Sequence, residues 1–512
     1  MVLNGCVGTP DDSPYSLAPG RLGAAAVTFF ALAAMAPLAV LGWVVPRLYA
    51  RGGGPLVPLT FAALAVVLLL FCRGYAAMAR RAPFAGALYA YVARGLGRPA
   101  AIAAAWGALL SYHLLQLGLY GIAGAAAVPL LHGWFGVRVA WWAAAGACWV
   151  LVALLGVVRV EIIGGLMALL VLTQTAVIAG FAAVNVIEPA GGGLTAGTVL
   201  PAGPAAIDRP ALGLLLAAGM LGFVGFETAG TYAEEAMRPR RDPGHAAYTA
   251  VVLAGLLLFV ASSAMGAAAG PGSVTASAGA RGPELVFDLA AARLPGWAVT
   301  AGRVVLLTAL VAAVLSVHAA VTRYLFALGR ERVLPAVLAR TARRAAVPRT
   351  ASLIQSLVVL VELVCAYAVG VADPAPLARR MTVAGGLGIL LLLLATALSA
   401  LLHLNRVPDG EGLWGRFAAP LLSTVALGAL AYLAVRNLPG LLGVPPDGRL
   451  AWLVPAALGA VTVLGMAHAW GLRRSRPLVY AGIGHGGPPV GVTPVIPKPR
   501  EPGAHRPGRV DR

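Results

Sequence analysis

The twelve residues 219–230, GMLGFVGFETAG, lie inside a long apolar run yet contain four glycines and one carboxylate, Glu227. Glycine weakens a helix because it loses more conformational freedom on folding than any other residue. A charged side chain at the centre of a bilayer costs on the order of 3 kcal/mol on insertion scales. Irregular backbone at that depth is tolerated only where it lines a cavity or is buried in protein. The stretch therefore predicts a break in a membrane helix, with Glu227 facing a cavity or a partner.

The composition is that of a protein that crosses a membrane many times. Of its 512 residues, 60% are hydrophobic and only 11% are charged, whereas a soluble domain carries about 25% charged residues. Apolar runs long enough to cross a bilayer recur along the whole chain, which predicts an all-α polytopic membrane protein embedded in the lipid bilayer. Twelve spans are expected, near residues 23–45, 56–79, 99–130, 139–158, 160–184, 211–236, 246–269, 298–328, 350–371, 380–403, 416–436 and 449–472.

Another interrupted span lies five spans before the one that contains Glu227. Span 23–45 carries Pro37 near its middle, and proline both removes a backbone donor and clashes with the preceding turn. Many transporters consist of two inverted repeats whose first helices are broken at a central site, although proline and glycine also serve kinks and close packing in membrane helices. Paired breaks favour two repeats, at 21–184 and 211–403, with two further spans within 404–475.

Arginine is distributed unevenly between the two sets of loops. The more basic set shares a side with both termini, so the positive-inside rule places the termini in the cytoplasm of a plasma-membrane protein. Residues 1–20 and 476–512 are then cytoplasmic tails, the second rich in Pro, Gly and His and expected to be disordered, and 185–210 is an extracellular loop. The arginines of the basic loops are Arg80, Arg81, Arg94, Arg98, Arg238, Arg240, Arg241, Arg323, Arg330, Arg332, Arg340, Arg343, Arg344 and Arg349.

Several classes of function are disfavoured by what the chain contains. The net charge of +19 resides in loops between apolar runs, so it reflects membrane topology rather than nucleic-acid binding. The four cysteines include no CxxC pair, which supports neither a metal site nor a disulfide framework. No GxSxG, HExxH, Walker or Rossmann motif occurs, so we expect neither an enzyme nor an ATP-driven pump, no cofactor and no obligate protein partner.

Four stretches resemble the amino acid–polyamine–organocation (APC) superfamily. They are ALAAMAPLAVLG at 31–42, GYAAMARRAPFAGALYAYVARGLGRP at 74–99, GFVGFETAGTYAEEAMRPRRDPGHA at 222–246 and RYLFALGRERVLPAVLAR at 323–340. Each stretch is weak by itself, and their order and spacing extend the resemblance over roughly residues 20–475. The resemblance implies a LeuT-type fold, a 5+5 inverted repeat plus two helices, and uptake or exchange of amino acids or related amines as a permease.

The resemblance also implies a substrate site at the two breaks. The substrate carboxylate would meet backbone amides of the first break, and its amino group would meet carbonyls of the second, with Phe223 or Phe226 as a gate. Helix ends can bind such groups through their unpaired backbone atoms. The residues implied are Ala34, Met35, Ala36, Pro37, Phe223, Val224, Gly225, Phe226 and Glu227.

This chain lacks several of the side chains that couple transport to an ion in relatives. Where relatives often carry a lysine early in the fifth helix, this chain has Gly165, and Gln174 stands at a later acidic position. The eighth helix offers Thr308, followed by Ala309, where sodium-coupled relatives have hydroxyls. A coupling proton and a coupling sodium ion therefore both remain open.

Other polar groups in the spans have both functional and purely structural interpretations. Glu227 either titrates during transport, positions the break, or packs as a hydrogen-bonded acid. Tyr112, Gln116 and Tyr120 share one face of the third span, where they line the substrate path or fasten the bundle. His318 either relays protons or packs as a satisfied histidine.

Charged groups at the cytoplasmic end of span 211–236 are candidate gate residues. Glu234 and Glu235 are expected to form ion pairs with Arg80, Arg81 or Arg323 that open and close the cytoplasmic gate. The alternative is solvated loop charge, where an exposed pair contributes about 0–1 kcal/mol.

Two other functional classes compete with a secondary amino acid transporter. A major-facilitator carrier of another solute would show two six-helix halves rather than breaks five spans apart. A non-transporting sensor or scaffold stays open because a fold does not fix function, although it would need a soluble output domain.

Overall fold

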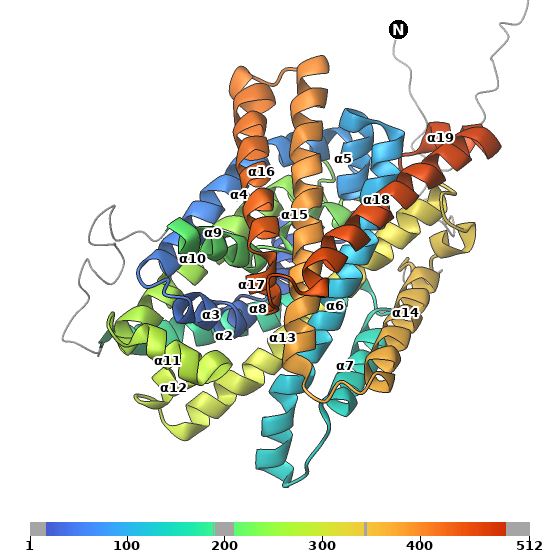
Figure 1. Cartoon of the computed structure of the whole chain (residues 1–512). Coiled ribbons are helices and arrows are strands. Elements are labelled where there is room, and N and C mark those ends of the chain that lie inside the picture. Colours follow the sequence, from blue (N-terminus) through green and yellow to red (C-terminus); the bar gives the residue numbers. More distant parts are fainter. Residues whose placement is uncertain (1–16, 188, 190–208, 343–345, 488–512) are drawn as a thin grey trace, which may run out of the picture.

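The computed structural model describes residues 17–187, 189, 209–342 and 346–487, and these form helices without a strand (Figure 1). Predictions for residues 1–16, 190–208 and 488–512 concern parts of the chain outside this description. Eleven helices of the described part are long and apolar enough to cross a bilayer. The expected span 139–158 corresponds to the shorter apolar helix α7, Trp141–Leu155. The all-α polytopic fold is confirmed.

Outside the two breaks, the long helices overlap the expected spans, and short helices that were not expected lie between and after them. They are α3 (Val45–Ala50), α4 (Leu56–Arg81), α5 (Ala87–Leu96), α6 (Arg98–Phe135), α8 (Val160–Ile187), α10 (Asp242–Ala269), α11 (Val274–Arg281), α12 (Leu285–Ala291), α13 (Gly296–Arg330), α14 (Arg349–Ala368), α15 (Pro374–Arg406), α16 (Ala419–Arg436), α17 (Leu438–Leu442), α18 (Arg449–Ser475) and α19 (Pro477–Gly482).

The first expected break lies between α1 (Ala24–Met35) and α2 (Pro37–Trp43). Ala36 joins them in the left-handed conformation, with φ +46°, which costs a non-glycine residue roughly 1–2 kcal/mol. Its N–H still closes α1 on the carbonyls of Leu32 and Ala33, both at 3.1 Å. Pro37 then starts α2, where its missing N–H and fixed φ suit the first helical position.

The second break divides the span that contains the glycine-rich stretch. Helix α9 (Arg209–Gly219) continues into a 3₁₀ turn, η3 (Met220–Gly222), and a second 3₁₀ segment, η4 (Phe226–Tyr232), follows. Gly225 between them has φ +123°, a conformation open only to glycine. A Cβ at Gly225 would lie 2.7 Å from the Ala34 carbonyl carbon and 2.8 Å from the Met35 nitrogen. The two breaks therefore touch each other, and glycine permits the contact.

Small residues also bring α15 close to α6, beside the breaks. A Cβ on Gly385 of α15 would lie 2.5 Å from the carbonyl oxygen of Ser111, and one on Gly118 of α6 would lie 2.6 Å from the Thr382 methyl. Membrane helices use glycine in this way because close backbone approach maximises packing where no hydrophobic driving force acts. The contact holds the first half of α15 against the middle of α6.

Both ends of the described chain lie at one end of the bundle, which we call the terminal face (Figure 1). The N–H of Leu22 donates to the Glu235 carbonyl at 2.9 Å, and the Met237 N–H donates to Leu22 at 2.8 Å. At the other end of the chain, the N–H groups of Gly484 and Gly486 donate to Glu331 at 3.0 and 2.8 Å. Disorder was expected from residue 476 onward, and that expectation is wrong for 477–487, because α19 and these glycines dock on the bundle.

Candidate functional site

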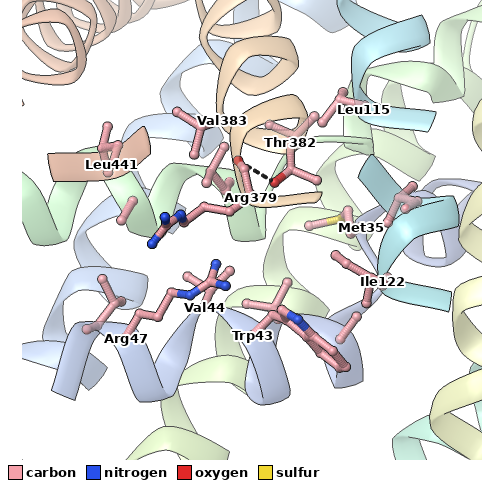
Figure 2. Close-up of a pocket in the computed structure, with 18 of the residues that line it drawn as sticks. Met35, Trp43, Val44, Arg47, Leu115, Ile122, Arg379, Thr382, Val383 and Leu441 are labelled. Carbon is pink, nitrogen blue, oxygen red and sulfur yellow. Dashed lines mark hydrogen bonds between the residues drawn. The ribbon is translucent and has the colours of Figure 1, made fainter. Parts of the chain in front are cut away.

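A cavity of about 320 Å³ lies where the two breaks meet. Its volume is within the range of small-molecule sites, roughly 300–1,000 Å³. The walls come from α1–α3, α6, α9 with the segment that follows it, α13, α15 and α17. Figure 2 shows apolar side chains such as Met35, Leu115 and Ile122 around it. The cavity extends from the breaks toward exposed Arg51, away from the terminal face.

The inner end of the cavity is formed by backbone of both breaks. Ala34, Met35 and Ala36 line it from the first broken helix, and Val224 and Gly225 line it from the second. The helical hydrogen-bond pattern is interrupted at these positions. In this conformation the Ala36 N–H donates to Leu32 and Ala33, and the Gly225 N–H donates to Glu227. The structure thus brings together five of the residues implied for the substrate site, whereas Pro37 is buried and does not line the cavity.

Glu227 lies directly behind this wall and is fully buried, with 1% of its surface exposed. One carboxylate oxygen accepts the Gly225 N–H at 2.9 Å, and the other accepts the Tyr112 hydroxyl at 2.9 Å. The hydroxyl of Tyr75 in α4 donates to the Glu227 backbone carbonyl at 3.1 Å. The residue therefore fastens the second break to α6 and α4, while its neighbour Tyr112 lines the cavity.

Gln116 and Tyr120, expected either to line the substrate path or to fasten the bundle, lie outside the cavity wall in this conformation. Gln116 instead accepts a 2.7 Å hydrogen bond from Gln355 of α14. An α-helix turns about 100° per residue, so each step of four residues drifts about 40° and Tyr120 lies about 80° round from Tyr112. The cavity follows the opposite drift along α6, through Leu115 and Leu119.

Phe223 and Phe226, which the resemblance implies as a gate, do not line the cavity in this conformation. The Phe223 ring packs 6.4 Å from that of Phe61, and the Phe226 ring packs edge-on 5.8 Å from that of Phe71. Side chains beside an unwound segment follow its local φ and ψ rather than a helical wheel, and here both turn toward α4. The aromatic side chains that do line the cavity are Tyr112 and Trp43, the second of which is labelled in Figure 2.

His318 and Thr308 of α13 lie away from the cavity. The His318 ring nitrogen Nε2 lies 3.0 Å from the Ser352 hydroxyl in a buried contact with α14. The Thr308 hydroxyl donates to its own helix, to Val305 at 2.9 Å. Both polar groups are satisfied by packing contacts, as most buried polar groups are, and Val317 is the α13 residue in the cavity wall.

Two acid–arginine pairs close the bundle at the terminal face. Arg323 donates two hydrogen bonds to Glu235, at 2.6 and 2.8 Å, and both side chains are buried. Arg330 forms a two-point ion pair with Glu234, which also accepts the Ala85 N–H at 2.8 Å. Two-point pairing of guanidinium with carboxylate adds geometric specificity to the charge attraction. The expected pair of Glu235 and Arg323 is thus present in the geometry, and Arg330 was not anticipated.

Arg80 and Arg81 are not the partners of these acids, contrary to expectation. Arg80 and Arg73 both pair with Glu411, in the segment after α15, and Arg81 donates to the carbonyls of Val407 and Pro408. Burial alone would raise the pKa of Glu411, but the hydrogen bond and charge of Arg80 outweigh it and lower that pKa. These partners differ from the expected ones because the segment after α15 folds back over α4, and the spacing of residues in the sequence does not reveal such a contact.

The outer end of the cavity is basic, and sequence reasoning missed it. Arg47, Arg51 and Arg379 line this end, and Figure 2 shows Arg47 and Arg379 reaching into one space from α3 and α15. The available signal was the position of these arginines in the loops on the less basic side of the membrane, where the positive-inside rule does not explain them.

Comparison with known proteins identifies the family. The pattern of the amino acid permease family matches residues 22–464, which covers both breaks, the cavity and both terminal-face ion pairs. No curated protein matches the chain. The family is one of membrane transporters rather than enzymes, and it carries the LeuT-type fold, so a major-facilitator carrier is set aside. This chain belongs to the amino acid permease family of the APC superfamily.

Proposed function

We propose that this protein is a secondary active transporter of amino acids or related small amines that works by alternating access. The observation that carries the proposal is the cavity at the contact between Gly225 and the Ala34–Met35 backbone. Broken helices at a central site are the binding device of inverted-repeat transporters. The α-carboxylate and α-amino group of the substrate would bind the interrupted backbone of Ala34, Met35 and Ala36 and of Val224 and Gly225.

The two ion pairs at the terminal face act as a closed gate. Glu235–Arg323 and Glu234–Arg330 tie the second broken helix to α13, while the cavity leads toward the opposite face. With both termini in the cytoplasm of a plasma-membrane protein, as the arginine-rich loops favour, this conformation faces outward. Transport would then require these pairs to separate when the substrate is carried to the inner side.

Glu227 holds the second break in place in this mechanism. Its two carboxylate oxygens are occupied by the Gly225 N–H and the Tyr112 hydroxyl. A substrate that contacts Tyr112 or Gly225 would therefore be sensed by the same hydrogen-bond network. We assign Glu227 a positioning role, which requires its hydrogen bonds rather than its charge.

The experiment is uptake into proteoliposomes from a panel of labelled amino acids and amines, with imposed proton or sodium gradients. Exchange is measured in parallel from vesicles preloaded with unlabelled substrate. We expect saturable uptake or exchange of at least one panel member, abolished by Gly225→Val, which fills the contact between the breaks. Gly165→Ala is the matched control because nothing lies within 4 Å of a Cβ at that glycine of α8. Folded, monodisperse protein without uptake or exchange of any member would refute the proposal.

A further inference from the structure

The outer end of the cavity is lined by three arginines. They are Arg47 of α3, Arg51 at the end of α3, and Arg379 of α15, and among the residues that the structure describes no aspartate or glutamate lines any part of the cavity. These arginines come from both broken-helix and α15 segments, so the tertiary fold and not a single loop collects them. A ligand in this cavity meets three guanidinium groups and no carboxylate of the described residues.

None of the three arginines has an acidic partner among the residues that the structure describes. The guanidinium groups of Arg47 and Arg51 have no hydrogen-bond or ion-pair partner there, although Arg47 is only partly exposed. Arg379 reaches the Gly443 carbonyl only at a long 3.5 Å, and its Nε is buried without a partner. Two arginines elsewhere in the bundle are paired with acids, Arg323 with Glu235 and Arg330 with Glu234. The cavity therefore holds donors that the described protein leaves unused.

Arg379 is close enough to both Arg47 and Arg51 for their charges to repel. Like charges in a partly buried site are unfavourable, because water and salt screen them less there than on an exposed surface. An anion placed between the guanidinium groups relieves this repulsion and receives charge-assisted hydrogen bonds. A cation in the same place adds to the repulsion.

We propose that this cavity selects an amino acid with a second carboxylate on its side chain, that is, a dicarboxylic amino acid. The inference rests on the proposed transport function and narrows it. The backbone of the two breaks takes the α-amino and α-carboxylate groups, and the arginines take the side-chain carboxylate at the opposite end. Guanidinium groups suit this task because their planar donor array matches the two oxygens of a carboxylate.

The apolar middle of the cavity is consistent with a substrate whose charged groups bind at the two opposite ends. Trp43, Val44, Leu115 and Ile122 surround the space between the breaks and the arginines (Figure 2). Their side chains accommodate methylene groups and offer little to a polar group at mid-length. Basic amino acids and polyamines are disfavoured, since their terminal ammonium would lie against the three guanidinium groups.

The test compares acids with their neutral amides in purified protein. L-glutamate and L-aspartate are measured against L-glutamine, L-asparagine and L-arginine by direct binding and by proteoliposome uptake at physiological salt. We expect the acids to bind at least tenfold more tightly than their amides, and L-arginine not to compete. Arg379→Gln and Arg47→Gln should each weaken acid binding by tenfold or more while the amides bind as before.

Arg138→Gln is the matched control, an exposed arginine outside the cavity that should leave binding unchanged. Uptake of neutral or basic amino acids in preference to acids, unaffected by Arg379→Gln, would overturn the inference and leave the transport function standing. If the selectivity for acids is present at low salt and lost at physiological salt, the arginines act only by long-range electrostatic steering, which is screened over about 8 Å. That result would also overturn the inference. Failure of every substrate would instead refute the transport function itself.

Discussion

The Tyr112 hydroxyl of α6 donates a 2.9 Å hydrogen bond to the Glu227 carboxylate, which also accepts the N–H of Gly225 at the break. One buried side chain thus joins the cavity wall to the unwound backbone. Because a carboxylate without donors in a buried site is costly, this network makes the position of the break depend on Tyr112. It also gives Glu227 a purpose that does not require it to exchange a proton.

Replacement of Glu227 separates the positioning role from a titrating one. Glu227→Gln keeps a carbonyl oxygen for the Gly225 N–H and can donate its amide to the Tyr112 oxygen, so we expect most uptake to remain, with an unchanged pH profile. Glu227→Ala leaves the Gly225 N–H and the Tyr112 hydroxyl unpaired, at about 1–3 kcal/mol for each buried group, and should abolish uptake. The measurements are uptake between pH 5 and 8 and thermal unfolding in detergent. Loss of pH dependence in Glu227→Gln would favour the titrating role.

A side chain at Gly225 is expected to disrupt the site. Gly225→Ala forces a non-glycine residue to φ +123° and sets its Cβ 2.7 Å from the Ala34 carbonyl carbon. Strain of this kind costs about 1–3 kcal/mol before the clash is counted. We expect a lower melting temperature and loss of substrate binding. The control Gly165→Ala should melt at the wild-type temperature or slightly above it, since alanine favours a helix. Equal behaviour of the two variants would contradict the contact between the breaks.

The pair of Glu235 and Arg323 is expected to stabilise the conformation closed at the terminal face. Glu235→Gln leaves the buried guanidinium without its counter-charge, and breaking one partner of a buried pair costs about 3–5 kcal/mol. The exposed pair of Arg303 and Glu284 is the control, where Glu284→Gln should cost about 0–1 kcal/mol.

The measurement is thermal unfolding of each variant, together with labelling of a cysteine placed at Ala236 on the terminal face. In Glu235→Gln we expect that cysteine to react faster with a water-soluble reagent, because the gate opens more often. Unchanged stability and reactivity in this variant would contradict the gate.

The docked segment after α19 is expected to loosen as pH rises. Burial raises the pKa of Glu331 to about 7, while the N–H groups of Gly484 and Gly486 partly oppose the shift. A carboxyl group whose pKa is higher when docked binds its proton more tightly in that state, so docking is strongest below the ordinary glutamate pKa of about 4.3. The favourable contribution is lost as pH rises toward 7, and little further change follows above that value.

Hydrogen exchange of residues 477–487, corrected for the intrinsic effect of pH, measures this change. Protection should fall between pH 5 and 7.5 in the wild type. Glu331→Gln is permanently neutral and should keep its protection across that range. A wild-type segment equally protected at both values would show that Glu331 does not control docking.

Both breaks could be predicted from sequence because their causes are local. Proline at position 37 has no N–H, and Gly225 can take a positive φ whatever surrounds it. The spans were predictable for a related reason, since each helix in a bilayer satisfies its own backbone and only needs enough apolar residues. Eleven of the twelve expected spans are long and apolar enough to cross a bilayer, two of them interrupted at the breaks, and the twelfth is the shorter α7.

The cavity wall could not be predicted in the same way. A soluble helix shows its buried face as an apolar stripe, but α6 is apolar all round, so nothing in its sequence tells that Leu115 lines the cavity and Gln116 does not. The ion pairs were hidden for another reason. In the sequence, Arg238 is the arginine that comes next after Glu234, but the ion-pair partner of Glu234 in the structure is Arg330. Only the packing of η4 against α13 decides between such partners.

The sequence by itself determined that the chain crosses the membrane, where its two central helices break, and which family it resembles. These properties follow from hydropathy, from the backbone chemistry of proline and glycine, and from short motifs. The tertiary structure alone decided that the breaks touch, that Glu227 is held by Tyr112, and that Arg47 and Arg379 meet across one cavity. Helix rotation and packing set those relationships, because residues hundreds of positions apart become neighbours only when the bundle closes.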